Sequence, residues 1–396
     1  MATKIGVGES KNINSFEAGK EAAKTAIEKA QISKCDFVIT FATVGYDQKE
    51  LINGIRLVTG NAPLAGSSGD GLITQSGPNE EIYGVTVMAI SSDEIKFQNA
   101  VVSGLKENSK KAGIEIAKQL NVSFPKNPIT LMLFPDCLTV NTSELFEGIE
   151  KNIKKPLPFI GGTSFDNWQF KKTYQYFNGE VLSNSVVAVL VSGEAKYLIK
   201  VNHGCEPLGI ERIVTKAKKN VIYEIDNKSA WEVFQEYIGP AEKETPFGKL
   251  IAHLSFGIKL PKKFAQTYDE YVIRTPMGLD EKTGAITVSA EIPKGTVIQL
   301  VRRDNEKIFR GVKQIAAEVK KELEGKKIIA AFQFDCAGRG GAVLGPQVKE
   351  IGIDPLQNTL GKDIPWIGFY TGGEIAPIKG KNFFHNYTVI LVVLYK

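Results

Sequence analysis

The stretch DFVITFATVGYDQKELINGIRLVTGNAPLAGSSGDG, residues 36–71, contains the pattern that decides the fold. It begins with an apolar run of strand length, passes through a loop at Tyr46-Asp47, and continues with apolar residues at helical spacing over 51–58. A second short apolar run ends at Gly66 and leads into the small-residue loop Ser67–Gly71. The order strand, helix, strand predicts two parallel strands joined by a right-handed crossover.

The same order of elements occurs twice more along the chain. The second copy begins with PITLMLF at residue 128, and the third begins with IIAAFQF at residue 328. Each copy has a proline, a short apolar run and a glycine before its second loop, and these anchor glycines are Gly66, Gly161 and Gly368. An apolar strand closes each copy. We therefore predict an α/β fold with mixed sheets built from repeated strand-helix-strand units, in two halves packed together.

Two segments lie outside the repeated units. Apolar and small residues recur at helical spacing over residues 15–30, which predicts a helix before the first unit. Residues 192–326 separate the second unit from the third, and much of this insertion alternates apolar and polar residues in the manner of an antiparallel meander. The tryptophans, Trp168, Trp231 and Trp366, are expected in the core.

Composition and charge restrict the class of protein. The 396 residues, 43% hydrophobic and 23% charged, are typical of a folded chain with more than one domain. The net charge of +5 comes from scattered lysines, so we expect no nucleic-acid surface. The chain has neither a signal-peptide pattern nor an apolar run long enough to span a bilayer, which predicts a cytoplasmic protein without membrane insertion. Its four cysteines lie far apart and are expected to be reduced thiols.

The loops that follow the predicted parallel strands are the candidate binding site. Parallel strands bring their carboxyl ends to one edge of a sheet, where open α/β sheets bind ligands. We therefore expect Tyr46-Asp47 beside Ser67–Gly71, and Asp335–Gly341 beside Phe369–Glu374. The side chains predicted to contact a small-molecule ligand are Tyr46, Asp47, Ser67, Ser68, Asp70, Thr163, Asp166, Cys336, Arg339, Tyr370, Thr371, Glu374 and His385.

Two of these residues have structural alternatives that involve charge. Asp47, with Glu50 three positions on, has the pattern of a helix capping box. Arg339 lies between glycines, which leaves its guanidinium room for a bidentate pair with a ligand carboxylate. The alternative for Arg339 is a salt bridge within the protein, to Asp335 or Glu374.

The cysteines and histidines give weaker signals. Cys336 follows an apolar strand, so a buried inert thiol is the default, and a nucleophile would need a base such as His385 beside it. His203 and Cys205 have a spacing that suits a metal, but a structural zinc site needs four ligands, and we predict none. His385 is expected to be a hydrogen-bonded structural histidine or a ligand contact.

Several motifs resemble those of the FIST family of bacterial and archaeal sensory proteins. They are FATVGYD (41–47), APLAGSSGDGLI (62–73) and GGTSFDN (161–167) in the first part, and YVIRTPMGLD (271–280), DCAGRG (335–340), PWIGFYTGGEIAP (365–377) and FHNYT (384–388) in the second. The first loop departs from the family pattern, because Ser67 and Leu72 stand where members usually have cysteine and glutamate. Glu374 keeps the acidic position in the third unit.

The resemblance implies an N-terminal-type FIST domain over residues 1–215 and a C-terminal-type domain over 216–396. It also implies a sensor of small ligands, with amino acids or related small carboxylates as candidates. Since the chain ends on a strand at Lys396, we expect a separate signalling protein to supply the output. Some members bind haem and sense nitric oxide, so a haem sensor that uses His385 or His203 is one alternative. A thiol-dependent enzyme that uses Cys336 is another.

Overall fold

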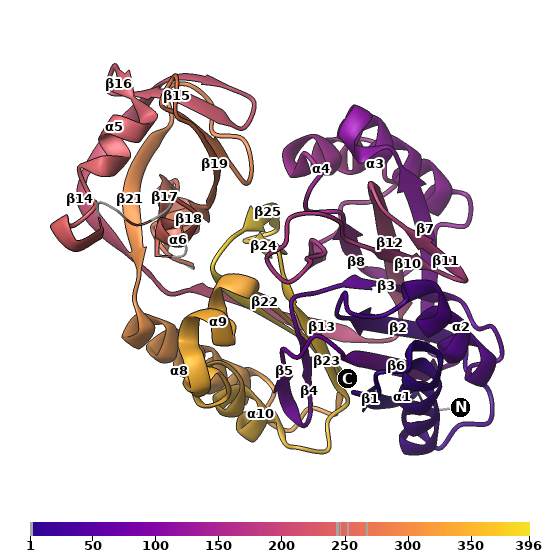
Figure 1. The fold of residues 1–396 in the computed structure, drawn as a ribbon. Coiled ribbons are helices and arrows are strands. Elements are labelled where there is room, and N and C mark those ends of the chain that lie inside the picture. The colour runs from indigo at the N-terminus through magenta and orange to yellow at the C-terminus, as the bar shows by residue number, and fades with distance from the viewer. Residues whose placement is uncertain (1–2, 243–244, 246, 252, 267) are drawn as a thin grey trace.

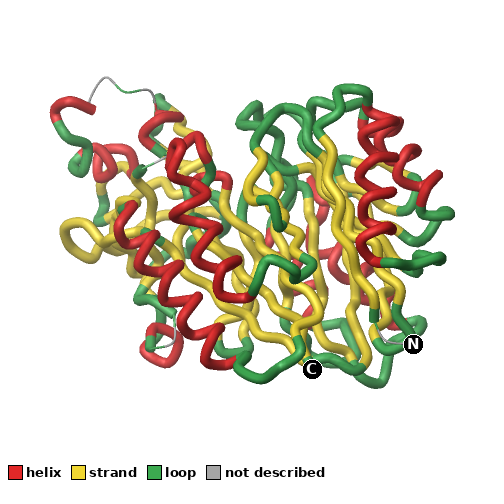
Figure 2. Tube along the Cα trace, turned by 90° about the horizontal axis from the view of Figure 1, so that it is seen from below, coloured by secondary structure: helices red, strands yellow, loops and turns green. Residues whose placement is uncertain are grey.

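The computed structural model describes residues 3–242, 245, 247–251, 253–266 and 268–396 (Figure 1). Three six-stranded sheets form the body, and a fourth sheet from the insertion stands beside it. In Figure 2 the strands gather in the middle and the helices lie at the flanks. The predicted α/β fold with mixed sheets is confirmed.

The body consists of three units with the same order of elements. The first contains β1 (Lys4–Ser10), α1 (Ser15–Ala30), β2 (Phe37–Ala42), α2 (Gln48–Val58), β3 (Leu64–Ser68), β4 (Leu72–Thr74), β5 (Gly77–Asn79) and β6 (Val85–Ser91). The second contains β7 (Ile95–Ser103), α3 (Leu105–Asn121), β8 (Pro128–Pro135), α4 (Thr142–Glu150), β9 (Phe159–Gly162), β10 (Gln175–Phe177), β11 (Glu180–Leu182) and β12 (Ser185–Gly193).

The third unit is interrupted by the insertion and has an irregular crossover. It contains β13 (Lys196–His203), α8 (Asn305–Glu322), β22 (Ile328–Cys336), β23 (Trp366–Thr371), β24 (Glu374–Ile378), β25 (Lys381–His385) and β26 (Thr388–Tyr395). Its crossover consists of a 3-10 turn (Ala337–Arg339), α9 (Gly341–Leu344), a second 3-10 turn (Gly345–Gln347), a π-helical turn (Lys349–Ile353) and α10 (Asp354–Leu360).

The insertion forms an antiparallel sheet, as the alternating pattern predicts. Its elements are β14 (Cys205–Lys218), β15 (Val221–Ile225), β16 (Lys228–Ser229), α5 (Ala230–Gln235), a 3-10 turn (Pro240–Glu242), α6 (Phe247–Leu250), β17 (Leu254–Lys259), α7 (Lys262–Ala265), β18 (Tyr271–Arg274), β19 (Pro276–Asp280), β20 (Ala285–Val288) and β21 (Val297–Arg303). The predicted domain boundary between residues 215 and 216 lies within β14 and remains a prediction. Among the described residues, no helix has the length and apolar character needed to cross a membrane.

Each unit contains the predicted parallel pair. β2 pairs with β3, β8 with β9 and β22 with β23 in parallel, and β6, β12 and β26 close the units in antiparallel fashion. Ala42 lies opposite Ser68 at the carboxyl ends of the first pair, and Cys336 lies opposite Thr371 in the third. The loops after these strands therefore leave from one edge, which confirms the expected geometry.

The short hairpins join the three units into a ring. The hairpin β4-β5 of the first unit extends the sheet of the third by pairing with β23, and β24-β25 of the third pairs with β9 of the second. In turn, β10-β11 of the second unit pairs with β3 of the first. The exchange is cyclic and gives the body an approximate threefold symmetry, with each sheet completed by a neighbouring unit.

The anchor glycines allow the parallel strands to approach closely. Gly66, Gly161 and Gly368 lie opposite Thr40, Leu133 and Gln333 in the three pairs. A Cβ atom at these glycines would lie 1.7, 2.4 and 1.9 Å from the carbonyl oxygen of the opposite residue. The repeated glycine is therefore a packing requirement, because any side chain there would push the two strands apart.

The core reflects the threefold arrangement. The residue after each glycine partner is a buried phenylalanine, namely Phe41, Phe134 or Phe334. Their ring centroids lie 5.3 Å (Phe41 to Phe134), 6.4 Å (Phe41 to Phe334) and 6.3 Å (Phe134 to Phe334) apart. These rings belong to one apolar cluster made by the inner faces of all three sheets, while the helices cover the outer faces.

Candidate functional site

Backbone hydrogen bonds close one end of the threefold axis. The N–H of Asp70 donates to the carbonyl of Tyr370 (2.9 Å), that of Gly372 to Thr163 (3.1 Å), and that of Phe165 to Ser68 (3.1 Å). Each bond joins the loop after the second parallel strand of one unit to the equivalent loop of another. The structure thus brings the predicted residues Ser68, Asp70, Thr163 and Tyr370 together at a single edge.

Three equivalent seams surround this edge. We call a seam the region between the loop that follows β2, β8 or β22 and the hairpin that pairs with β3, β9 or β23. The first seam joins residues 46–49 to β10-β11, the second joins residues 137–141 to the β24-β25 hairpin, and the third joins residues 337–341 to Glu80, which follows β5. The side chains in them differ, so the three seams have different chemistry.

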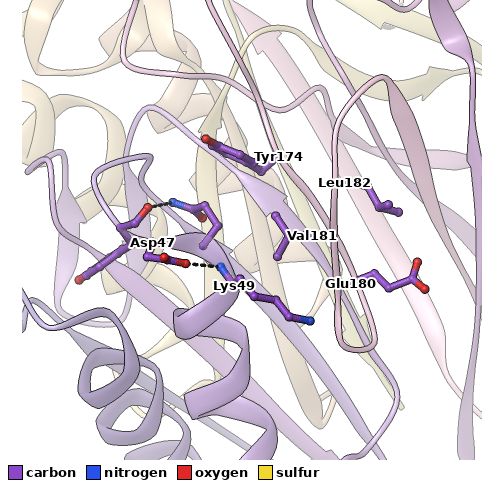
Figure 3. A pocket seen from close by; sticks show the side chains of 8 residues that line it. Asp47, Lys49, Tyr174, Glu180, Val181 and Leu182 are labelled. Carbon is purple, nitrogen blue, oxygen red and sulfur yellow. Dashed lines mark hydrogen bonds between the residues drawn. The ribbon is translucent and has the colours of Figure 1, made fainter.

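The first seam is an open groove of about 660 Å³ (Figure 3). Asp47 lies there, but its carboxylate caps α2, accepting from the N–H groups of Lys49 (3.0 Å) and Glu50 (3.1 Å). The cap interpretation is confirmed, although the N–H of Asp47 donates to Ser15 rather than to Glu50. The ring of Tyr46 is buried, and burial raises the pKa of its hydroxyl.

The second seam and the inserted sheet enclose a separate site. A cavity of about 460 Å³ between them adjoins a cavity of about 40 Å³, and the two share Phe165, Phe170, Met277 and Gly372. We call these joined cavities the cleft. Predicted residues on its walls are Thr163, Cys336 and Thr371. Residues that sequence reasoning missed come mainly from the insertion. They include Lys219, Ser289 and Glu291, which no motif marks, and Met277, which lies in the motif YVIRTPMGLD.

An aromatic loop, residues 166–172, lies at the cleft. The buried Asp166 carboxylate accepts from the N–H groups of Phe170, Lys171 and Lys172 at 2.9, 2.7 and 3.0 Å, which fixes the loop. Asn167, Trp168 and Phe170 have φ of 55, 60 and 52°, a region that bulky side chains rarely adopt. Asp166 is thus a structural residue rather than a free ligand contact in this structure.

Trp168 is a correction to the sequence prediction. It is 36% exposed rather than part of the core, because the left-handed backbone directs the loop outward, and Phe170 beside it is 43% exposed. The indole N–H of Trp168 donates to the Asp70 carboxylate at 2.9 Å. Burial raises the pKa of Asp70 to about 7, and the bond from Trp168 opposes that rise. Asp70 therefore holds the aromatic loop.

Of the serines in the first loop, Ser68 is hydrogen-bonded within the fold, whereas the buried Ser67 hydroxyl has no hydrogen-bond partner among the described residues. Ser68 donates to the carbonyl of Phe165 (2.9 Å) and accepts from the N–H of Tyr174 (3.0 Å). Ser67 is fully buried in β3, opposite Gln175 of β10. Both residues join the first unit to the second, and neither lines the cleft cavities.

Cys336 and His385 are not arranged as a nucleophile and base. Burial raises the pKa of the Cys336 thiol well above its usual value, and nearby Glu374 adds to this rise. The Nε2 of His385 lies 3.0 Å from the carbonyl of Ala376, and its Nδ1 lies 3.4 Å from the hydroxyl of Tyr268. Burial lowers the pKa of His385 to about 3. Its two nitrogens are engaged, so the ring is a structural hydrogen-bonding group.

The two histidines do not fit axial ligation of haem. Both are buried, and His385 has its ring nitrogens engaged as described. The Nδ1 of His203 accepts from the N–H of Cys205 (3.1 Å), and its Nε2 lies 3.3 Å from the Asp269 carboxylate. Within the described part of the chain, no cluster of three or more His, Cys, Asp or Glu residues is placed to hold a metal ion.

Glu374 is fully buried beneath the third loop. Its carboxyl oxygens accept from the hydroxyl of Thr371 (2.6 Å) and from the N–H (3.0 Å) and hydroxyl (2.7 Å) of Thr388. Burial raises its pKa to about 8, against the lowering effect of these bonds. Glu374 thus ties the end of β23 to β26 and does not pair with Arg339.

The third seam contains Arg339, whose side chain is 1% exposed. Its Nε lies 3.4 Å from Oδ1 of Asp335, so the ion-pair alternative to Asp335 matches the geometry. Burial raises the pKa of Asp335 to about 6, and the guanidinium opposes that rise. Tyr370 is also fully buried, and burial raises its pKa. The predicted residues Arg339 and Tyr370 therefore belong to an interior polar cluster and not to the cleft walls.

Comparisons with known proteins agree with the sequence motifs. Residues 36–228 match the model of the FIST N domain, and residues 230–377 match that of the FIST C domain. An uncharacterized protein of Mycobacterium bovis is 28% identical over 268 residues, which is 66% of this chain and 66% of the relative. One of Methanocaldococcus jannaschii is 30% identical over 189 residues, covering 46% and 36% of the two chains. A solved cyanuric acid hydrolase aligns over 100% of both chains at 7% identity, with a TM-score of 0.38.

Proposed function

This chain belongs to the FIST family, and on that premise we propose that it is a sensory protein that binds a small ligand in the cleft. One observation carries the proposal. The larger cavity, about 460 Å³, is of the size that proteins use for small molecules, and its walls come from both the body and the inserted sheet. A ligand there would contact both parts, so occupancy would bias their relative position.

The walls of the cleft favour a ligand with an apolar body and a charged end. Phe165, Phe170 and Met277 provide apolar surface shared by both cavities. Lys219 and Glu291 line the larger cavity with opposite charges. This combination supports an amino acid or a related small carboxylate, with Lys219 receiving the carboxylate and Glu291 the ammonium group.

The proposal includes a separate output partner and a cytoplasmic location. A shift of the inserted sheet on ligand binding would change the surface presented to a second protein, which would convert occupancy into a signal. The four free cysteines support a reducing compartment. Neither alternative, the haem sensor or the thiol enzyme, has an observation in its favour, given the engaged nitrogens of His385 and the burial of His203 and Cys336.

Calorimetry with the common amino acids and matched small carboxylates tests the ligand class. Glu291→Gln should weaken binding of amino acids about tenfold or more, because it removes a charge-assisted contact to the ammonium group. Binding of carboxylates without an amine should change little. Glu324→Gln, at an exposed position after α8, is the matched control and should behave as the parent. The proposal is wrong if no member of the panel binds, or if Glu291→Gln binds amino acids with the same affinity as the parent.

A further inference from the structure

We propose that the third seam is a second, enclosed binding site, specific for a small carboxylate, with the guanidinium of Arg339 as its receptor. The site does not depend on the cleft and would take a different ligand. Three features of the seam support this: its unpartnered polar groups, its equivalence to the other two seams, and the irregular segment that covers it.

The guanidinium of Arg339 is the first observation. Its side chain is 1% exposed, yet among the described residues none of Nε, Nη1 and Nη2 has a hydrogen-bond partner. The nearest counter-charge, Oδ1 of Asp335, lies 3.4 Å from Nε and outside hydrogen-bond geometry. A buried guanidinium has five N–H groups to satisfy, and its planar fork matches a carboxylate. The buried guanidinium is thus placed to receive a carboxylate.

Other unpartnered atoms lie in the same place. Tyr370 is the register neighbour of Asp335 in the pair β22-β23, and Gln333 precedes Asp335 by two residues, on the same face of β22. In the described part of the chain, the hydroxyl of Tyr370, Oε1 of Gln333 and Oδ1 of Asp335 have no hydrogen-bond partner. The amide of Gln333 donates to Oδ2 of Asp335 at 3.0 Å. A bound carboxylate would accept from the tyrosine hydroxyl as well as from the fork.

The equivalence of the seams explains why a site lies here. The first and second seams contain cavities of about 660 and 460 Å³. In the third, the carboxylate of Glu80 enters from the first unit, and its two oxygens lie 2.8 and 2.7 Å from the backbone nitrogen of Gly341. A Cβ atom on Gly340 would lie 2.5 Å from that carboxylate. The glycine loop around Arg339 therefore already accommodates one carboxylate.

The negative charges near Arg339 compete with an external anion. Burial raises the pKa of Asp335 to about 6, so protonation of Asp335 near neutral pH would free the guanidinium for a ligand. Binding should therefore strengthen as the pH falls. The other charged or titratable groups that act on Asp335, Tyr370 or Arg339 are Glu80, Asp70, Glu374, Arg303, Cys205 and Cys336.

The segment that covers the site is the least regular crossover of the three. The first two units cross over through α2, of 11 residues, and α4, of 9 residues. The third uses two 3-10 turns, a four-residue helix, a π-helical turn and α10, and the carbonyl of Gly352 in the π-helical turn accepts from Gln333 at 3.4 Å. Short irregular turns of this kind occur at hinges and functional sites. Opening of this segment would admit a small anion.

The test uses sodium formate as the probe and sodium chloride at equal ionic strength as its reference. Formate should raise the melting temperature of the protein, more at pH 6 than at pH 8, and titration of carbon-13 formate by NMR should give its affinity. Asp335→Asn removes the competing carboxylate without changing its shape. It should tighten formate binding about tenfold at pH 8 and reduce the difference between pH 6 and pH 8, because Asp70 and Glu374, with pKa values of about 7 and 8, still titrate there. Arg339→Met should abolish the formate effect, while Arg310→Met, at an arginine that is 71% exposed, should retain it.

The opposite results would identify a structural ion pair. If formate and chloride have the same effect on the melting temperatures of the parent and of Asp335→Asn, Arg339 is only the ion-pair partner of Asp335, and water completes its hydrogen bonds. If Arg339→Met fails to fold, the double variant Asp335→Asn/Arg339→Met removes both charges together and should fold without a formate response. A formate response that persists in the double variant would overturn the assignment to this seam.

Discussion

Replacing Gly66 by alanine tests the close approach that recurs in all three units. The new Cβ would lie 1.7 Å from the carbonyl oxygen of Thr40, in the middle of the parallel pair β2-β3. Contacts of a Cβ atom below 3.0 Å are essentially never seen, so this distance is 1.3 Å shorter than the shortest contact that real Cβ atoms make. The obstacle is backbone, which cannot rotate away as a side chain does. The two strands must therefore separate or lose their register.

The expected loss in the free energy of unfolding has two parts, overpacking of the core and weakened hydrogen bonds between β2 and β3. Overpacking of a core typically costs about 2 kcal/mol. Separation of the strands around Gly66 also weakens ladder hydrogen bonds on either side of it, at about 1 kcal/mol each. For two such bonds, the total is about 4 kcal/mol, a large part of the roughly 5–15 kcal/mol that stabilises a typical protein. The same reasoning applies to Gly368, whose Cβ would lie 1.9 Å from the carbonyl oxygen of Gln333.

Urea unfolding followed by circular dichroism measures this cost. The matched control is Gly278→Ala in β19, where the nearest atoms to a new Cβ are those of the Thr287 side chain at 3.9 and 4.0 Å. The control should change the free energy of unfolding by less than about 1 kcal/mol. If Gly66→Ala and Gly368→Ala are as stable as Gly278→Ala, the close register of the parallel pairs is wrong, and the repeat has another cause.

Three further predictions concern buried groups. The free energy of unfolding should fall as the pH rises from about 4.5 to about 8, because Glu374 stays protonated in the folded state over this range but ionises in the unfolded state. In urea melts, Glu374→Gln should reduce this slope; an equal slope in the variant would contradict the raised pKa of Glu374. Asp166→Ala removes the acceptor of three backbone N–H groups, so hydrogen exchange at residues 170–172 should accelerate about tenfold or more, with Asp166→Asn between the two; unchanged exchange would mean that the loop is held by other contacts. The Cys336 thiol should react with Ellman's reagent at pH 7.4 about a hundredfold more slowly than in the unfolded chain, since burial raises its pKa. Cys336→Ser should keep ligand binding, whereas rapid labelling of Cys336 would favour the thiol-dependent enzyme.

The sequence predicted the elements of the fold better than their assembly. The helix over residues 15–30 and the three parallel pairs follow from local periodicity, and the structure confirms them. The exchanged hairpins were not predicted, because strands such as β4 and β10 have only 3 residues each and pair with other units far away in the chain. The insertion at 192–326 also concealed that the third unit completes a ring.

The sequence predicted where the loops meet but not what their side chains contact. The carboxyl edge follows from topology, and the loops predicted to meet there do so. Local sequence does not reveal which polar atoms are used by the fold, so Asp47, Ser68 and Asp166 were candidates although backbone groups occupy them. Lys219 and Glu291 were missed because they reach the cleft from the insertion through tertiary packing alone.

The symmetry of the backbone is broken by side chains at equivalent positions. Asp70, Phe165 and Gly372 each donate the same backbone hydrogen bond around the axis. At Gly372 a Cβ atom would lie 2.9 Å from the ring of Phe165, so the missing side chain leaves room for that ring on the wall of the cleft. At Asp70 the carboxylate instead holds Trp168, which places the aromatic loop beside the same cleft. The three equivalent positions of one backbone ring therefore differ in chemistry, because they carry an acid, an aromatic ring and no side chain.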